Sequence, residues 1–281
     1  MFPLPLDIKL LLPGYRARWR ARYACMLAEL EALAPSLTYG EDDGTPWIEL
    51  AQENLRLFGF RTELKNAEVY RILRGALPPS IPLSHFRLVK DCLNRYVYPH
   101  MRPDLKPAEF ATEAMFGFHG QHKDAIADLA DADAREKLSQ AFVPRPDDVV
   151  IDCGPFLGFG ELRIAPALVD GHMFAVEADR ACHALLSRNM SHNGIENVTV
   201  LHRAVWDSET ELDLQSDFAQ ANSLVSEVHI GAEVERVRTI TIDAIVEAHS
   251  IQKLDMLSLT LNGAEVEAIK GAERTLPDLR P

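Results

Sequence analysis

Residues 149–161 read V-V-I-D-C-G-P-F-L-G-F-G-E, and the architecture of the C-terminal half of the chain follows from this stretch. A short apolar run ends at Asp152, a loop follows, and an amphipathic stretch begins at Leu162. The glycines of the loop are Gly154, Gly158 and Gly160. Glycine is favoured where the backbone needs a positive φ or where a ligand comes close. The order predicts a strand, a glycine-rich turn and a helix whose N-terminus presents free backbone N–H groups to a ligand.

The spacing of these glycines distinguishes between two nucleotide cofactors. The dinucleotide fingerprint is G-x-G-x-x-G directly after a strand, whereas this loop reads D-x-G-x-x-x-G-x-G. The carboxylate of Asp152 would repel a pyrophosphate but can accept hydrogen bonds from an amino group. The loop therefore favours S-adenosylmethionine, which carries an ammonium and a sulfonium, over NAD. An ordinary glycine-rich turn without a ligand is the alternative interpretation.

A second acidic residue ends the next predicted strand. Residues 172–176 are apolar and Glu177 follows them, about 20 residues beyond the glycines. A carboxylate at this place in a βαβ unit accepts hydrogen bonds from both ribose hydroxyls of a bound nucleotide. Glu177 is therefore predicted to bind the ribose, with a solvated strand end as the alternative. NAD would need the same acid, so only the loop separates the two cofactors.

The remaining C-terminal elements alternate as expected for an α/β domain. The predictions are a helix over 182–190, a strand over 198–201, a hairpin formed by 211–214 and 236–242, a helix over 243–249, a strand over 254–261 and a helix ending near 274. Ala204 lies between Arg203 and Val205, directly after the third strand of the sheet. A cofactor's adenine ring would lie there, so these residues are predicted to contact it.

The composition argues against some classes of partner. The chain has 281 residues, and its 42 acidic against 29 basic side chains give a net charge of −13. Such a surface repels a phosphate backbone, so nucleic acid is not an expected partner. The four cysteines are scattered, which predicts reduced thiols in a cytoplasmic protein. The apolar start is too short for a transmembrane segment and lacks the charge pattern of a signal peptide.

Residues 1–110 are predicted to form a helical N-terminal module. Helical patterns over 47–58, 67–77 and 84–98 are separated by prolines. The module contains no catalytic motif. It could pack on the catalytic domain, cap a substrate pocket or form a homodimer, and the pattern does not choose between these roles.

Two histidines in the segment F-G-F-H-G-Q-H-K raise the question of a metal. His119 and His122 are three residues apart, but glycines weaken a helix there and no third ligand is nearby. No metal is therefore expected, and the segment is interpreted as a lid or a substrate contact.

The span Asp147–Leu276 resembles the FkbM-type methyltransferases, a branch of the class I S-adenosylmethionine-dependent enzymes. The matching segments are the loop at 149–160, F-A-V-E-A-D, N-V-T-V-L-H-R-A-V-W-D-S-E-T, T-I-T-I-D-A-I-V and L-D-M-L-S-L-T-L-N-G-A-E-V-E-A-I-K-G-A. The resemblance implies a Rossmann-like sheet over 111–281 and transfer of a methyl group to a hydroxyl. The acceptor would be a sugar, lipid or secondary metabolite, either a small molecule or a glycan.

The end of the fourth strand departs from the family pattern. The family reads close to K-I-D-V-E-G-x-E, but this chain reads S-L-T-L-N-G-A-E, so Thr260 replaces an aspartate and Asn262 a glutamate. Asn262 can orient a hydroxyl but cannot accept its proton, which leaves Glu265 as the candidate base. Glu265 is alternatively a first-turn carboxylate favoured by the helix dipole. A non-catalytic cofactor-binding or scaffold protein is the alternative function.

The number of strands is a second departure. Only about four of the seven core strands of a class I sheet are recognisable before Pro281. The sheet is therefore expected to be truncated after its fourth strand, which would leave that strand as an uncovered edge.

Overall fold

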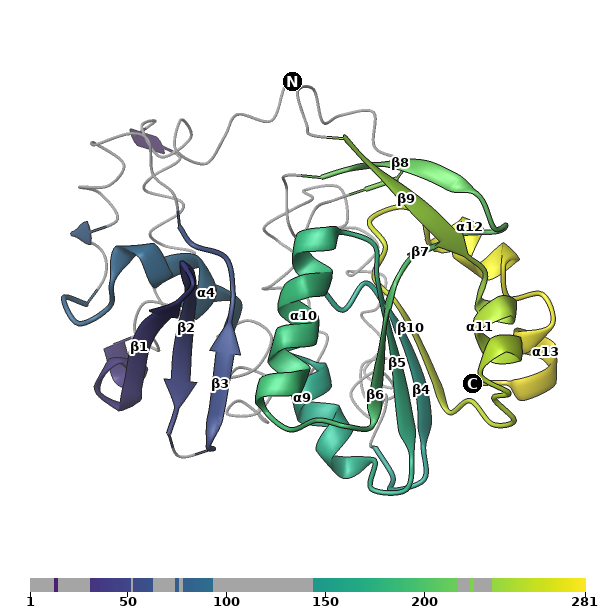
Figure 1. The fold of residues 1–281 in the computed structure, drawn as a ribbon, viewed down its shortest axis with the longest axis horizontal. Coiled ribbons are helices and arrows are strands. Elements are labelled where there is room, and N and C mark those ends of the chain that lie inside the picture. The colour runs from purple at the N-terminus through teal and green to yellow at the C-terminus, as the bar shows by residue number, and fades with distance from the viewer. Residues whose placement is uncertain are drawn as a thin grey trace.

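The structure is a computed structural model of the chain. It describes residues 13–14, 31–51, 53–62, 74–75, 78–92, 144–216, 223–224 and 234–281. An N-terminal part built on an antiparallel sheet lies beside a C-terminal part built on a parallel sheet (Figure 1). None of the described helices is long and apolar enough to cross a membrane.

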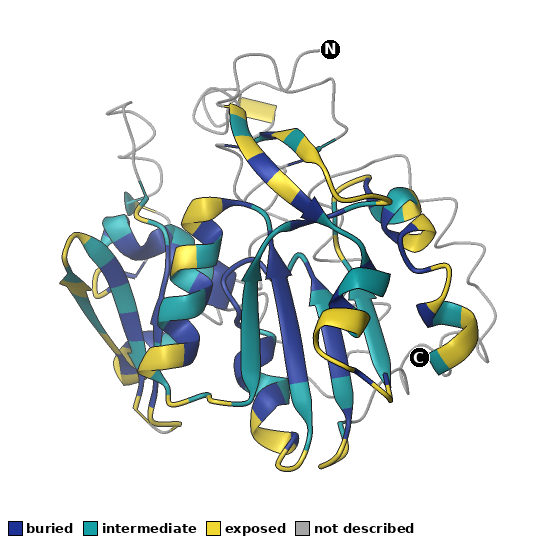
Figure 2. Ribbon diagram, turned by 45° about the vertical axis from the view of Figure 1, so that its right-hand side comes forward, coloured by how far each residue is buried: buried dark blue, intermediate teal, exposed yellow. Residues whose placement is uncertain are grey.

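A parallel sheet forms the centre of the C-terminal part. Its strands are β4 (Val149–Cys153), β5 (His172–Glu177), β6 (Val198–His202) and β10 (Met256–Leu259), paired in the order β10-β4-β5-β6. These are the four strands predicted from the apolar runs. The two middle strands are largely buried, as the dark blue of Figure 2 shows, which explains why they are apolar rather than alternating. Their carboxyl ends meet at one edge, where the connecting loops converge.

Helices cover both faces of this sheet. They are α9 (Glu161–Ile164) with η4 (Ala165–Ala167), α10 (Arg180–His192), α11 (Ile242–Ala248), α12 (Glu265–Lys270) and α13 (Thr275–Leu279). The side chains of β5 alternate between the two cores. Ala175 packs into the core that contains α10, whereas Phe174 and Val176 pack into the core that contains α11 and α12. The predicted βα alternation is thus present.

A hairpin extends beyond the parallel sheet. β8 (Glu211–Gln215) pairs antiparallel with β9 (Val234–Ile240), and β9 pairs parallel with β7 (Ala204–Val205). The hairpin predicted over 211–214 and 236–242 is therefore confirmed. It lies above the carboxyl ends of the parallel strands (Figure 1).

The prediction of a helix over 47–58 is wrong. The described N-terminal part contains η1 (Ala34–Ser36), β1 (Leu37–Asp42), β2 (Thr45–Leu50), β3 (Leu55–Phe58), η2 (Leu83–His85) and α4 (Phe86–Cys92). Burial alternates along β2, which is the period of a strand. The β1–β2 turn has φ +52° at Asp43 and +75° at Gly44, as a two-residue hairpin requires.

Only part of the predicted helical module can be compared with the structure. α4 lies within the helix predicted over 84–98. Most of the helix predicted over 67–77, the domain boundary near residue 110, and His119 and His122 lie outside the described residues.

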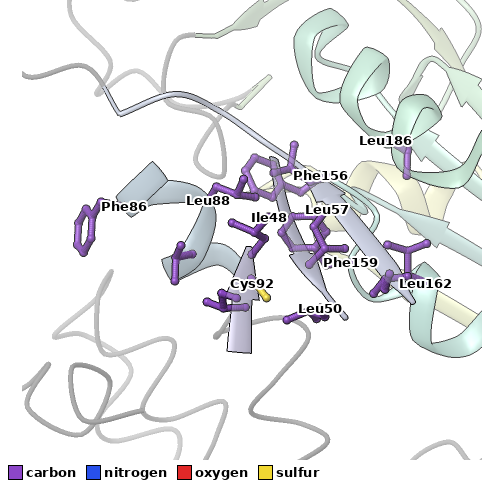
Figure 3. Close-up of a cluster of buried hydrophobic side chains, with 14 of the residues drawn as sticks. Ile48, Leu50, Leu57, Phe86, Leu88, Cys92, Phe156, Phe159, Leu162 and Leu186 are labelled. Atoms are coloured by element: carbon purple, nitrogen blue, oxygen red, sulfur yellow. The ribbon is translucent and has the colours of Figure 1, made fainter. Parts of the chain in front are cut away.

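The two parts share one hydrophobic core, shown in Figure 3. Ile48 and Leu57 enter it from the antiparallel sheet, Phe156 and Phe159 from the glycine-rich loop, and Leu186 from α10. α10 lies between the two sheets and contacts both β3 and β6 (Figure 1). The N-terminal part is therefore packed directly against the loop that was predicted to bind a cofactor.

Candidate cofactor pocket

A pocket opens at the carboxyl ends of the parallel strands. About 600 Å³ of space lies within it, including open solvent, and its lining combines apolar side chains with a few polar groups, as small-molecule sites do. Of the residues predicted to form the site, it brings together Gly154, Glu177, Arg203, Ala204, Val205 and Asn262. Asp152, Gly158, Gly160 and Glu265 do not line it.

Glu177 is the acidic residue of the pocket, and its side chain is held by the backbone. Its Oε2 accepts a hydrogen bond from the Phe156 N–H at 3.1 Å, and its Oε1 accepts one from the Asp179 N–H at 2.9 Å. The residue is 8% exposed, and burial raises its pKa to about 7. A carboxylate has about four acceptor sites, so these N–H groups leave capacity for a hydroxyl donor.

Glycine is required at the three loop positions to different degrees. Gly154 has φ +88°, and a Cβ there would lie 2.2 Å from the Thr260 carbonyl oxygen. Gly158 has φ +78°, and its Cβ would lie 2.4 Å from Leu186 Cδ1 of α10. Gly160 precedes α9 with φ −68° and open space around it. Only Gly154 lines the pocket, so the other two glycines serve the packing or the path of the loop.

Asp152 lies inside the sheet, one residue before the end of β4. It is paired with Ala175 of β5 and Ser258 of β10 and is half-buried. Its predicted contact with the amino group of a cofactor stays a prediction.

Phe156 is a pocket residue that the sequence analysis missed. It adopts a left-handed conformation with φ +61°, which is uncommon for a bulky residue. Its N–H donates to Glu177, and its ring lies 6.1 Å from the ring of Phe60. The glycines around it announce a turn, but no sequence signal identifies Phe156 itself as left-handed.

The wall after β10 carries uncharged polar groups. Thr260 and Asn262 line the pocket, and the Asn262 backbone oxygen accepts a hydrogen bond from Ser223 Oγ at 2.9 Å. Asn262 has φ +53° in the tight turn before α12. Its predicted part in orienting a hydroxyl stays a prediction.

Glu265 braces this same turn. Its carboxylate accepts hydrogen bonds from the Leu261 N–H and the Gly263 N–H, both at 2.9 Å. It lies in the first turn of α12, where the helix dipole favours a negative charge. This geometry fits the capping interpretation, and the role of Glu265 as a base stays a prediction.

The hairpin supplies a further wall of the pocket that the sequence analysis missed. Leu214, Ser223 and Leu224 line it. Arg203, which was predicted to contact an adenine ring, lines the pocket as well and lies directly after β6. The alternation of apolar and polar residues along β8 indicates that Leu214 faces the protein interior. No local signal indicates which part of the sheet the hairpin covers. Among the described residues, no group of three His, Cys, Asp or Glu side chains could hold a metal ion.

Fold and site together define a class: an α/β domain with a candidate cofactor pocket where a glycine-rich loop meets an acidic strand end. Residues 163–281 match the family model described as methyltransferase FkbM domain. The match begins after the glycine-rich loop and includes Glu177, Ala204 and Asn262. The resemblance drawn from the sequence is therefore confirmed.

Several solved structures overlap with parts of the chain. A candidate transferase of Pyrococcus horikoshii is 25% identical over 26% of this chain and 28% of its own, with a TM-score of 0.21. The YcgJ protein of Bacillus subtilis is 21% identical over 28% and 34%, with a TM-score of 0.21. A SAM-dependent methyltransferase of Aquifex aeolicus is 18% identical over 34% and 53%, with a TM-score of 0.23. The chain thus covers no more than about half of these proteins. No curated protein matches it.

Proposed function

We propose that this protein is an S-adenosylmethionine-dependent O-methyltransferase that acts on a hydroxyl of a small molecule or glycan. The family of residues 163–281 supports the reaction class. The observation that carries the cofactor assignment is the buried carboxyl group of Glu177 at the end of β5, facing a pocket bordered by Gly154.

The residues of the pocket fit this cofactor. Glu177 would accept hydrogen bonds from the ribose hydroxyls, since its backbone N–H partners do not use all of its acceptor sites. The apolar side chains of Val205, Leu214 and Leu224 would contact the adenine ring. When bound, the cofactor supplies an electrophilic methyl group.

The contribution of the protein to catalysis would be mainly proximity and alignment. Among the described residues that line the pocket, Glu177 is the only carboxylate, and the proposal assigns it to the ribose. Thr260 and Asn262 would orient the acceptor hydroxyl by hydrogen bonds. The reaction would therefore depend on holding the acceptor oxygen in line rather than on a strong base.

The acceptor can be sought with S-adenosylmethionine labelled in its methyl group. Pools of sugars, lipids and hydroxylated metabolites would be incubated with the protein, and labelled products isolated. The proposal predicts a label in a base-stable methyl ether. A label that base releases as methanol would indicate a methyl ester and contradict transfer to a hydroxyl.

A non-catalytic cofactor-binding protein is the second candidate, and the uncharged residues after β10 favour it. The double variant Thr260→Asp, Asn262→Glu restores the acidic residues of the family pattern. Methyl transfer gained only in the variant, with the parent inactive, would support a protein that has lost its chemistry. Transfer already present in the parent would rule this candidate out.

A further inference from the structure

β3, the third strand of the N-terminal sheet, is hydrogen-bonded to two asparagines: Asn189 within α10 and Asn193 directly after it. Asn189 accepts a hydrogen bond from the Phe58 N–H at 2.7 Å and donates to the Phe58 carbonyl at 3.1 Å. Asn193 accepts from the Arg56 N–H at 2.9 Å and donates to the Arg56 carbonyl at 2.8 Å. The two side chains thus occupy the hydrogen-bonding edge of β3 as a neighbouring strand would.

Asn189 differs from Asn193 in one contact. Its Nδ2 also donates to the carbonyl of Leu157 in the glycine-rich loop, at 2.8 Å. The second donor contact of Asn193 is instead the Asn189 carbonyl of its own helix. Asn189 is fully buried. If its side chain were removed, the backbone groups that it bonds would be left buried without a hydrogen-bond partner, which is unfavourable. One side chain therefore ties β3 to the loop.

A second contact joins the same elements two residues further on. The ring of Phe60 lies 6.1 Å from the ring of Phe156, and the guanidinium of Arg87 lies 4.7 Å from the Phe60 ring. Phe156 has φ +61°, a conformation that is energetically unfavourable for a residue with a side chain. Such a conformation persists when the surroundings fix it.

Phe156 connects these contacts to the pocket. It lines the pocket, and its N–H donates to Glu177 Oε2. A change in the loop conformation that moved this N–H away would remove a backbone donor from Glu177. The contacts therefore run from β3 through Phe156 and Leu157 to the carboxylate that is predicted to bind the ribose.

We propose that residues 55–60, the β3 clamp, hold the glycine-rich loop in the conformation that binds the cofactor, with Asn189 and Phe60 as positioning residues. The proposal rests on the proposed function for the identity of the ligand. It gives the N-terminal part a role in the reaction that is separate from contact with the acceptor.

The test compares Asn189→Ala and Phe60→Ala with Asn193→Ala as the matched control. Asn189→Ala and Asn193→Ala each remove two hydrogen bonds to β3, but only the first removes the bond to Leu157. Calorimetry with S-adenosylhomocysteine, at a temperature where all variants are folded, measures the dissociation constant. We expect it to rise about tenfold in Asn189→Ala and Phe60→Ala, the effect of losing about one positioned hydrogen bond, and to change less than about twofold in Asn193→Ala.

Hydrogen exchange of the unliganded protein provides the second readout. The amide of Phe156 should exchange faster in Asn189→Ala and Phe60→Ala than in the parent, while the amides of β5 stay protected. Parent-like affinity and exchange in both variants would overturn the proposal, as would an equal loss of affinity in Asn193→Ala. If Asn189→Ala does not fold, the half-buried Phe60 decides the outcome. A parent that binds no S-adenosylhomocysteine would refute the proposed function, whereas the exchange result would still test the clamp.

Discussion

Glu177 is the residue whose chemistry matters most for the proposed cofactor. Its pKa is raised to about 7 by burial, so that near neutral pH about half of the molecules carry a protonated carboxyl. Ribose hydroxyls donate hydrogen bonds to the ionised carboxylate. The cofactor should therefore bind more tightly to protein in which Glu177 has lost its proton. Affinity for S-adenosylhomocysteine should therefore rise by about fivefold between pH 6 and 7 and level off above the pKa. Calorimetry of the parent and of Glu177→Gln would check this, since the same pH profile in the variant would exclude Glu177 as the cause.

The same group predicts a pH dependence of folding stability. Because its pKa is higher in the folded than in the unfolded chain, the folded state binds the proton more tightly. The contribution of Glu177 to the free energy of unfolding is thus fully present below about pH 4.5. It is lost as the pH rises through about 7, by on the order of 3 kcal/mol. In Glu177→Gln, the free energy of unfolding should lack this decrease with rising pH. Urea unfolding at several pH values gives the comparison, and parallel slopes for parent and variant would contradict it.

Gly154 and Gly160 provide a matched pair within the loop. Gly154→Ala places a methyl group 2.2 Å from the Thr260 carbonyl oxygen at φ +88°, so it should lower the free energy of unfolding by about 2 kcal/mol or more. Gly160→Ala meets open space at φ −68° and should be neutral or raise the stability by up to about 1 kcal/mol. Chemical denaturation of both variants measures this difference. Equal destabilisation would show that the backbone at Gly154 is not as constrained as described.

At the scale of elements, the turn before α12 separates the two interpretations of Glu265. Removing its carboxylate in Glu265→Ala leaves the Leu261 and Gly263 N–H groups without their acceptor, which should lower the stability by about 1–2 kcal/mol. The control is Glu267→Ala in the same helical turn. This variant loses only an ion pair with Lys270, so the midpoint of its urea unfolding should change little. A normal stability of Glu265→Ala combined with loss of methyl transfer would instead favour the catalytic interpretation.

The C-terminal elements could be predicted from the sequence because each has a local signal. The four apolar runs became β4, β5, β6 and β10, and the pattern of the hairpin was also visible. Tertiary contacts decided the rest. Phe156 is held in a left-handed conformation by neighbours that are distant in the sequence. The hairpin is positioned by the pairing of β9 with β7 rather than by any motif.

The helix predicted over 47–58 was wrong because two short strands were interpreted as one helical pattern. β2 and β3 are separated by a turn in which Asn54 has φ +50°, so the apolar residues on either side belong to different strands. The Asp43-Gly44 pair before Thr45 is a strong hairpin signal that favoured strands in this region.

At the scale of the whole molecule, the core shared by the two sheets predicts cooperative unfolding. Side chains from β2, β3, the glycine-rich loop and α10 pack into one cluster, so neither part should lose its packing alone. Trp47 in β2 and Trp206 after β7 can report on the two parts separately. Variants that retain one of these tryptophans should show the same urea midpoint by fluorescence, whereas an earlier midpoint for Trp47 would show that the N-terminal part unfolds independently.

Binding of S-adenosylhomocysteine by isothermal calorimetry, with Glu177→Ala as the control, tests the central claim most directly. The account predicts a single site of roughly micromolar affinity, on the order of 8 kcal/mol, that is lost or strongly weakened in the variant. A well-folded parent that gives no binding heat, and whose melting temperature does not respond to the ligand, would contradict the assignment of this pocket to S-adenosylmethionine.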